Sequence, residues 1–297
     1  NIDLGAHASV TGTVGSNLNN SDSLDKHKQA EIVGDFYTGP ETDSNSISDL
    51  QDAITDGQVI KLESERSYTL PLFPGFPDLA ERDSLNVNSD ITINQDGKYD
   101  SIKFTGNGSL DIYTGNSGDE RKISVNSLET NNDITLSGEG ILKLYIAEKL
   151  KLNGKAVLNA GDSIAELRDR LIVYYAGTNK LQITGQSQII GAVYSKLAPI
   201  KVAGSGNILD DIICGGDSIT ITGNAFSDDS KQIANRVIYA PGASVSFNGN
   251  SDFFSGSIIA DQISLGSHTE IIQFKVPPND VPFDFKNIGK YQKDYWH

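Results

Sequence analysis

The chain has 297 residues, enough for one large domain or two ordinary ones, so core size is no obstacle to independent folding. It carries 24 lysine and arginine residues against 39 aspartate and glutamate residues, and the formal net charge of −15 disfavours adhesion to nucleic acid or to an anionic membrane. With 29 glycines, no methionine and a single tryptophan, the composition favours many turns and short strands over packed helices. An all-β protein is the first prediction.

Two early segments look like turns of a repeating structure. They are SVTGTVGSN at 9–17 and AEIVGDFYTG at 30–39, and the polar loop NNSDSLDKHK separates them. Both place apolar residues beside small or polar ones and end near a glycine, as short strands with tight corners do. We predict that each forms part of the main fold.

Residues 42–85 are predicted to be an insertion. From Thr42, the sequence TDSNSISDLQDAITDG places apolar residues at helical spacing, and we interpret it as a short helix with Asp49 as N-cap. The following SYTLPLFPGFPDL holds three prolines, which exclude regular ladder pairing. We expect this part to be an extended strap laid over the rest of the fold.

A five-residue unit then recurs along the chain: apolar, any, apolar, polar or small, glycine. It occurs as IKFTG from Ile102, ITLSG from Ile134, LKLNG from Leu150, LQITG from Leu181, IKVAG from Ile200, ITITG from Ile219 and VSFNG from Val245. A second unit lies between these, as in IVYYAG from Ile172, IGAVYSK from Ile190, VIYAPG from Val237 and GSIIADQ from Gly256. Strict alternation in such short pieces predicts strands with one buried face.

The spacing of these units predicts a parallel β-helix. Spacing alone does not determine its handedness, and we expect it to be right-handed. Most starts after Ile134 are 16 to 19 residues apart, which fits three short strands in each turn, and the longer steps are explained by insertions. A β-sandwich or an antiparallel barrel also has short strands, but neither explains the reuse of one strand sequence at a fixed period. We expect about a dozen turns.

Two further elements complete the predicted organisation. DSIAELRDRLIV from Asp162 holds a possible helical turn beside a strand. The composition changes abruptly after Val276, and we expect residues 277–297 to be a tail that caps or docks on the last open turn. Residues 1–276 are predicted to form one domain.

Several phrases in order resemble the β-helical ectodomain of PilX-type type IV pilus assembly proteins and related bacterial surface proteins. They are RLIVYYAGTNKLQITGQSQIIGAVYSKLAPIKVAGSGNI, GGDSITITGNA and VIYAPGASVSFNGNSDFFSGSIIADQISLGS, together with SVTGTVGSN and YTLPLFPGFPDL near the start. A bactofilin-like solenoid is a weaker resemblance. The resemblance covers about residues 5 to 274 and implies a right-handed β-helix outside the cell, normally behind an N-terminal membrane or pilin-like helix that this chain lacks. It transfers no catalytic motif, and the tail after Val276 departs from it.

Tyrosines recur in the second unit and are the candidate binding residues. They are Tyr174, Tyr175, Tyr194 and Tyr239. Stacked on an outer face, they would offer a platform for a carbohydrate or a protein. The alternative is an aromatic ladder that is turned inward or covered by the strap.

Carboxylate pairs raise the question of catalysis, because glycosidases need two acids facing one groove. The candidates are Asp210 with Asp211, Asp217 nearby, and Asp228 with Asp229, and a lyase-like neighbourhood occurs at Arg168, Asp169 and Arg170. Polygalacturonases place Gly-His-Gly and Arg-x-Lys beside their aspartates, and no histidine here lies in such a setting: the histidines are His7, His27, His268 and His297. We therefore predict solvent-facing corner aspartates, a solvated helical turn at 168–170 and no enzyme.

No cofactor or metal site is predicted. The loops NNSDSLD and TDSNSISD are rich in oxygen ligands but lack the residue order of a calcium loop, and zinc ligand clusters are missing. Cys214 lies in the apolar run IICGG, where a buried, inert thiol is expected. A local patch for DNA is conceivable only at Lys143, Lys149, Lys151 and Lys155.

Together these features predict a non-catalytic structural or adhesion protein of the cell surface, a minor pilin or pilus-associated ectodomain that presents loops for attachment or assembly. Its expected partners are pilus or cell-envelope proteins and host or environmental glycans or surfaces. Nucleic acid is disfavoured, and membrane contact is expected only through the missing helix. The expected location is extracellular. The alternative function is a carbohydrate-active β-helix, either a polysaccharide lyase or a hydrolase.

Overall fold

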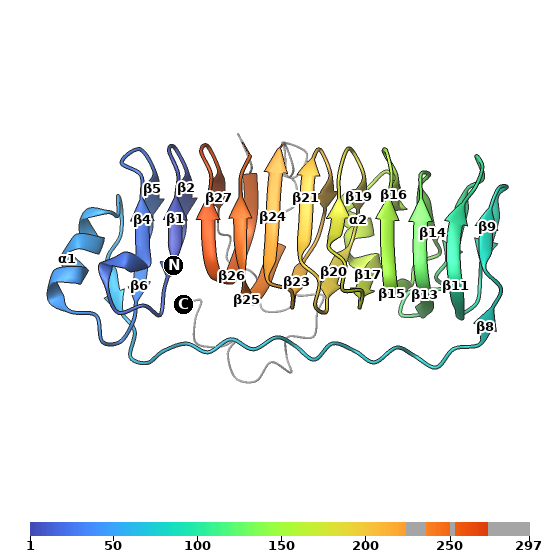
Figure 1. The fold of residues 1–297 in the computed structure, drawn as a ribbon, viewed down its shortest axis with the longest axis horizontal. Coiled ribbons are helices and arrows are strands. Elements are labelled where there is room, and N and C mark those ends of the chain that lie inside the picture. The colour runs from blue at the N-terminus through green and yellow to red at the C-terminus, as the bar shows by residue number, and fades with distance from the viewer. Residues whose placement is uncertain (224–235, 250–252, 273–297) are drawn as a thin grey trace. The chain divides into compact units, whose positions relative to one another are not determined.

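The computed structural model describes residues 1–223, 236–249 and 253–272. The chain is a β-solenoid of about 11 turns, built mostly of parallel strands, and its described part has two short α-helices (Figure 1). The predicted parallel β-helical fold is therefore confirmed. The chain divides into two compact units: unit 1 consists of Asn1–Pro71 and Thr220–His297, and unit 2 of Leu72–Ile219.

Each turn of unit 2 has three sides, because its strands pair in three parallel ladders. The first side consists of β8 (Glu81–Arg82), the N-terminal halves of β11 (Gly97–Phe104), β13 (Glu120–Thr130) and β15 (Ile141–Leu152), and then β17 (Leu171–Tyr175), β20 (Ala192–Ser195) and β23 (Ile212–Cys214). The second side consists of β9 (Leu85–Val87), the C-terminal halves of β11, β13 and β15, and then β18 (Leu181–Ile183) and β21 (Ile200–Gly204). The third side consists of β10 (Ile91–Ile93), β12 (Leu110–Tyr113), β14 (Ile134–Ser137), β16 (Val157–Ala160), β19 (Gln188–Ile189) and β22 (Asn207–Ile208).

Aliphatic ladders fill the interior of unit 2. On the first side the register aligns Ile123, Leu144, Val173, Val193 and Ile212, all of which are buried. Each such side chain contributes about 1.5–3 kcal/mol relative to an exposed one. The period-two alternation in the sequence exists because every second residue enters this column. A helical insertion, α2 (Ile164–Leu167) followed by the 3-10 turn η2 (Arg168–Arg170), lies between β16 and β17, as predicted.

Unit 1 joins the two ends of the chain. Its strands are β1 (Ile2–Leu4), β2 (Ser9–Thr11), β3 (Val14–Gly15), β4 (Leu24–Lys26), β5 (Glu31–Val33), β6 (Phe36–Thr38), β7 (Val59–Lys61), β25 (Arg236–Phe247), β26 (Phe253–Leu265) and β27 (Glu270–Ile272), while β24 (Ser218–Gly223) begins in unit 2 and ends in unit 1. Strand β1 pairs with β26 on one edge and β4 on the other, and β2 lies likewise between β27 and β5 (Figure 1). The early segments at 9–17 and 30–39 thus form strands, as predicted. Strand β2 of the first segment docks on the C-terminal strand β27, whereas β5 and β6 of the second pair with β2, β3 and β7.

This pairing bears on the predicted capping tail. Strand β27 is paired with β26 and with β2, so the edge that we expected residues 277–297 to cover is already paired. The tail itself lies outside the described residues. The N-terminal strands therefore protect this edge from pairing with other chains.

The predicted helix is present, but its start was placed wrongly. Helix α1 (Ser44–Asp52) has Asp43 as its N-cap, and the Asp43 carboxylate accepts bonds from the backbone N–H groups of Asn45 and Ser46, each at 2.9 Å. Asp49 lies within the helix. The earlier start adds Ser44–Asp49 to the helix, which is about 1.7 turns, and Leu50 of this helix is 2 % exposed.

The predicted strap SYTLPLFPGFPDL has no helix or strand, as its prolines indicated, and the same holds for all of residues 62–80, which we call the strap from here on. In unit 1 it is held by side chains. Asn17 accepts a bond from the Arg66 N–H at 3.0 Å and donates one to the Arg66 carbonyl at 2.6 Å, while the Arg66 guanidinium lies 5.3 Å from the centre of the Tyr37 ring. Side chains of the coil thus replace the ladder hydrogen bonds that the strap lacks.

Candidate functional site

Tyrosines at one position of three neighbouring strands form a ladder on the first side of unit 2. The register places Tyr145 of β15 beside Tyr174 of β17, and Tyr174 beside Tyr194 of β20. The rings of Tyr145 and Tyr174 are stacked with centroids 5.0 Å apart, and those of Tyr174 and Tyr194 are tilted with centroids 6.5 Å apart. In-register parallel strands put equivalent residues above one another, so a repeated tyrosine becomes a continuous aromatic surface.

Two phenylalanines of the strap cover this ladder. Phe73 makes edge contacts with Tyr194 and Tyr174 at centroid distances of 5.0 and 6.0 Å. Phe76 contacts Tyr145 in the same way at 5.5 Å. Tyr194 and Tyr145 are consequently 4 % and 6 % exposed. The ladder packs against the chain's own strap, which buries Tyr145 and Tyr194 and partly buries Tyr174.

Burial also fixes the protonation of the ladder. Desolvation, with smaller contributions from Tyr145 and the Glu120 charge, raises the pKa of Tyr174 to about 12. Desolvation and Glu120 raise the pKa of Tyr145 as well. Both phenols are therefore neutral at pH 7, and neither is suited to act as a base.

The structure brings together two of the four predicted tyrosines, Tyr174 and Tyr194. Tyr175 points away from this ladder, is 2 % exposed, and donates its hydroxyl to the carbonyls of Glu148 at 3.0 Å and Asn179 at 2.9 Å. Tyr239 belongs to unit 1, where its hydroxyl donates to the carbonyl of Thr69 in the strap at 2.9 Å. The arrangement matches the strap-covered ladder that the sequence left open as an alternative.

Sequence reasoning missed Tyr145, Phe73 and Phe76. Tyr145 lies in ILKLYIAEKL, which lacks the glycine that closes IVYYAG. The spacing of the phenylalanines in the strap could have indicated that they contact the tyrosine ladder. Three residues of extended chain span about 9.3 Å, which is close to the separation of about 9.6 Å across two strand spacings. Phe73 and Phe76 are thus spaced to meet tyrosines on different turns.

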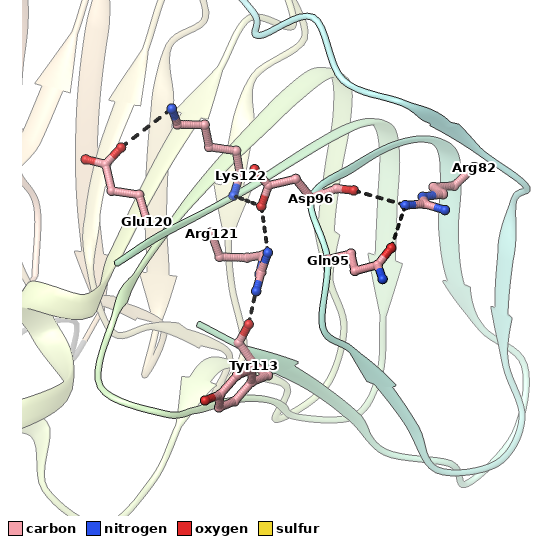
Figure 2. Close-up of polar contacts among 7 residues, drawn as sticks. All are labelled: Arg82, Gln95, Asp96, Tyr113, Glu120, Arg121 and Lys122. Carbon is pink, nitrogen blue, oxygen red and sulfur yellow. Dashed lines mark hydrogen bonds and ion pairs between the residues drawn. The ribbon is translucent and has the colours of Figure 1, made fainter. Parts of the chain in front are cut away.

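Charged and polar residues of β8, β13 and the turn before β11 continue the site (Figure 2). The Arg121 Nη1 donates to the Asp96 carboxylate at 2.8 Å, its Nε donates to the Tyr113 carbonyl at 2.9 Å, and the Lys122 backbone N–H donates to the same Asp96 oxygen at 3.1 Å. Arg82 donates to the Gln95 side chain at 3.0 Å. Asp96 thereby ties the turn before β11 to β13, one turn further along.

Glu120 links this charged group to the tyrosine ladder. It forms ion pairs with Lys143 and, at 3.7 Å, with Lys122. The hydrogen bond from Lys143 is the main reason that the pKa of Glu120 lies below its usual value. Such partly exposed pairs contribute about 0.2–1 kcal/mol each. Their geometry supports the corners of the coil and contains no open reaction centre.

The predicted solvent-facing position of the Asp210–Asp211 pair is wrong. These residues are 2 % and 1 % exposed, and the Arg168 Nε lies 3.9 Å from the Asp210 Oδ1. Burial, and next the charge of Asp211, raise the pKa of Asp210 to about 8. The sequence misleads here because two adjacent aspartates are typical of a corner, and the helical insertion with Arg168 is what permits their burial. Asp217 is exposed, whereas Asp228 and Asp229 lie outside the described residues.

Arg168, Asp169 and Arg170 form the helical turn η2, but the prediction that it is solvated is wrong for Arg168, whose side chain is 16 % exposed. Cys214 is fully buried. Burial raises the pKa of the Cys214 thiol to about 11. Within residues 1–223, 236–249 and 253–272, no three His, Cys, Asp or Glu side chains gather in a way that would hold a metal ion. No helix in these ranges is long and apolar enough to cross a membrane.

No family model, no curated protein and no solved structure matches this chain.

Proposed function

We propose that this protein is a non-catalytic display protein of the bacterial cell surface, a minor pilin or pilus-associated ectodomain that presents its loops for adhesion or assembly. The observation that carries the proposal is the burial of Asp210 and Asp211, at 2 % and 1 % exposure. A glycosidase needs both carboxylates open to the sugar chain. Aspartates that are buried inside the coil have a structural role instead.

The aromatic ladder supports the same proposal. Its rings contact Phe73 and Phe76 of the strap, so the most distinctive aromatic surface of unit 2 is used inside the molecule. The interior ladders are continuous, which gives a stiff scaffold of the kind that display requires. The resemblance of the β17–β26 sequence to PilX-type ectodomains is the basis for the location and the pilus association.

Cell fractionation of the native host tests this proposal. The full gene product, tagged at a surface loop, is expected in the surface or pilus fraction and is expected to be removed by protease added to intact cells. A cytoplasmic, protease-resistant product would contradict the proposal. Reading the gene upstream of Asn1 for a prepilin-like helix gives an independent check.

One observation favours the alternative of a carbohydrate-active β-helix. A carboxyl group whose pKa lies near 8, as for Asp210, is typical of a general acid. Incubating the purified chain with neutral and acidic polysaccharides is expected to release no reducing sugar. Release by the wild type that is lost in Asp210→Asn would replace the display proposal with the enzymatic one.

A further inference from the structure

The second side of unit 2 carries an outward row of polar side chains between its buried, mostly apolar residues. On β11, β13 and β15 the row consists of Lys103, Glu129 and Lys151, which are register partners. On β18 and β21 it consists of Gln182 and Lys201, which are also partners. Neighbouring strands lie about 4.8 Å apart, so charges recur along this side at short, regular intervals.

Two more lysines flank this row. Lys149 is an exposed residue of β15, two positions before Lys151, and Lys180 is exposed one position before β18. We call the set Lys103, Lys149, Lys151, Lys180 and Lys201 the lysine strip. Lysine is depleted in strands, so packing preferences do not account for such a set.

The lysine strip has an excess of positive charge. Lys149 and Lys151 share one carboxylate, that of Glu129, at 3.1 and 3.2 Å, and their hydrogen bonds lower the pKa of Glu129. Glu148 adds one exposed carboxylate at the corner before Lys149. Lys103, Lys180 and Lys201 form no ion pair with any residue in the described part of the chain. In a chain of net charge −15, this is a local reversal of sign.

We propose that the lysine strip binds an acidic polysaccharide, a chain of uronic acid units. Ammonium groups at intervals of one to a few strand spacings suit a polymer with one carboxylate on each sugar, and the Gln182 amide offers both a donor and an acceptor to sugar hydroxyls. The inference deepens the proposed function, since it names a partner for the display protein and rests on that protein being non-catalytic.

Nucleic acid fits this surface less well. The outward row has no aromatic side chain on which a base could stack, which removes the main sequence-tolerant attraction for single strands. Duplex DNA gains its affinity from many phosphate contacts, and the overall negative charge of the protein repels a polymer of that charge density.

Binding of the full chain to polygalacturonate, measured by calorimetry at low salt, tests the inference. The triple variant Lys103→Gln, Lys151→Gln, Lys201→Gln is expected to bind about tenfold more weakly, because it loses three ion pairs with the carboxylates of the polysaccharide at the protein surface. The matched control, Lys28→Gln, Lys61→Gln, Lys98→Gln, removes the same charge from exposed positions elsewhere and is expected to bind as the wild type does. Glu129→Gln is expected to bind more tightly, since it releases Lys149 and Lys151.

If both triple variants bound polygalacturonate equally weakly, the polysaccharide would be attracted by the net charge of the protein alone, and the inference would be overturned. Binding to duplex DNA in preference to polygalacturonate, or no binding to the polysaccharide at all, would also overturn it. Circular dichroism establishes that the variants keep their fold. Absence of binding leaves the display function standing, whereas cleavage of the polygalacturonate would overturn the display function itself.

Discussion

Unit 1 and unit 2 carry different residues at the outward positions of their coils. In unit 1 the row across β25, β26, β1 and β4 consists of Ser246, Ser264, Asp3 and Asp25, in register. In unit 2 the row across β11, β13 and β15 consists of Lys103, Glu129 and Lys151. The inward neighbours of both rows are mostly buried apolar residues, such as Leu4 and Leu128. The inward residues therefore determine the coil structure in both units. The outward residues differ between the units and determine the charge of each outer surface.

The units also differ in how their turns are joined. In unit 2, successive turns follow one another along the chain. In unit 1, Ile2 pairs with Ile263 on one edge and with Leu24 on the other, so strands from both ends of the chain share one ladder. Pairing across so long a separation costs more chain entropy and forms late in folding. Close contacts between the N-terminal turns of unit 1 must offset this entropy cost, so the stability of unit 1 depends on them.

A methyl group added at a corner of unit 1 is expected to have the largest effect. Gly34 has a φ of +139°, and a Cβ there would lie 2.1 Å from the Gly12 carbonyl oxygen. Gly34→Ala is expected to lower the free energy of unfolding by about 3 kcal/mol through strain and clash, as measured by urea denaturation. Gly75→Ala, where the Cβ would meet nothing within 4 Å, is the control and should change little. Equal stability of the two variants would show that the corners of unit 1 are not closely packed.

The periodic sequence predicted the strands and their inward residues but not the order of the turns. ITITG and VSFNG correctly placed Ile219 and Val245 in the interior. Nothing in SVTGTVGSN indicates that it pairs with β27, because one repeat unit docks equally well on any similar unit. The order of the turns is determined by the segments that connect them. Local sequence patterns do not show that the strap connects β7 to β8.

The candidate site was predictable to a similar extent. The repeated phrase identified Tyr174 and Tyr194, and the prolines identified the strap. That Phe73 lies against these tyrosines depends on contacts between residues about a hundred positions apart, which local periodicity does not encode. Burial of Asp210 likewise depends on Arg168 in an insertion that looked like a solvated helical turn.

Asp210 is a buried carboxyl of unit 2, and its titration is expected to have an intermediate effect. Its raised pKa, about 8 against 3.8, means that the native state keeps a proton which the unfolded chain releases. The free energy of unfolding should therefore fall as the pH rises from about 4 to 8, by about 2.6 kcal/mol between pH 5 and 7. Arg168, Asp169 and Asp211 surround the group and share in its titration.

Asp210→Asn removes the titrating proton and keeps the shape of the side chain. Thermal unfolding across this pH range is expected to show a flatter dependence for the variant, with stability close to that of the wild type at pH 5 and higher at pH 8. Identical slopes for the two proteins would show that Asp210 is ionised in the native state, with Arg168 balancing its charge. The pH dependence would then have to arise elsewhere in the coil.

The smallest effect on stability is expected where the strap meets unit 2. Phe73→Ala removes two edge contacts, with Tyr194 and Tyr174, and the cation–π contact with the Lys196 ammonium, which lies 5.5 Å from the ring centre. The expected cost is about 2 kcal/mol. Leu72→Ala is the control, because Leu72 is 94 % exposed and has little contact to lose. Proteolysis within residues 62–80 and nitration of tyrosines should both accelerate in Phe73→Ala and not in Leu72→Ala. If the two variants react alike, the outer surface of unit 2 is held by its own strands, and the strap is a passive connection between β7 and β8.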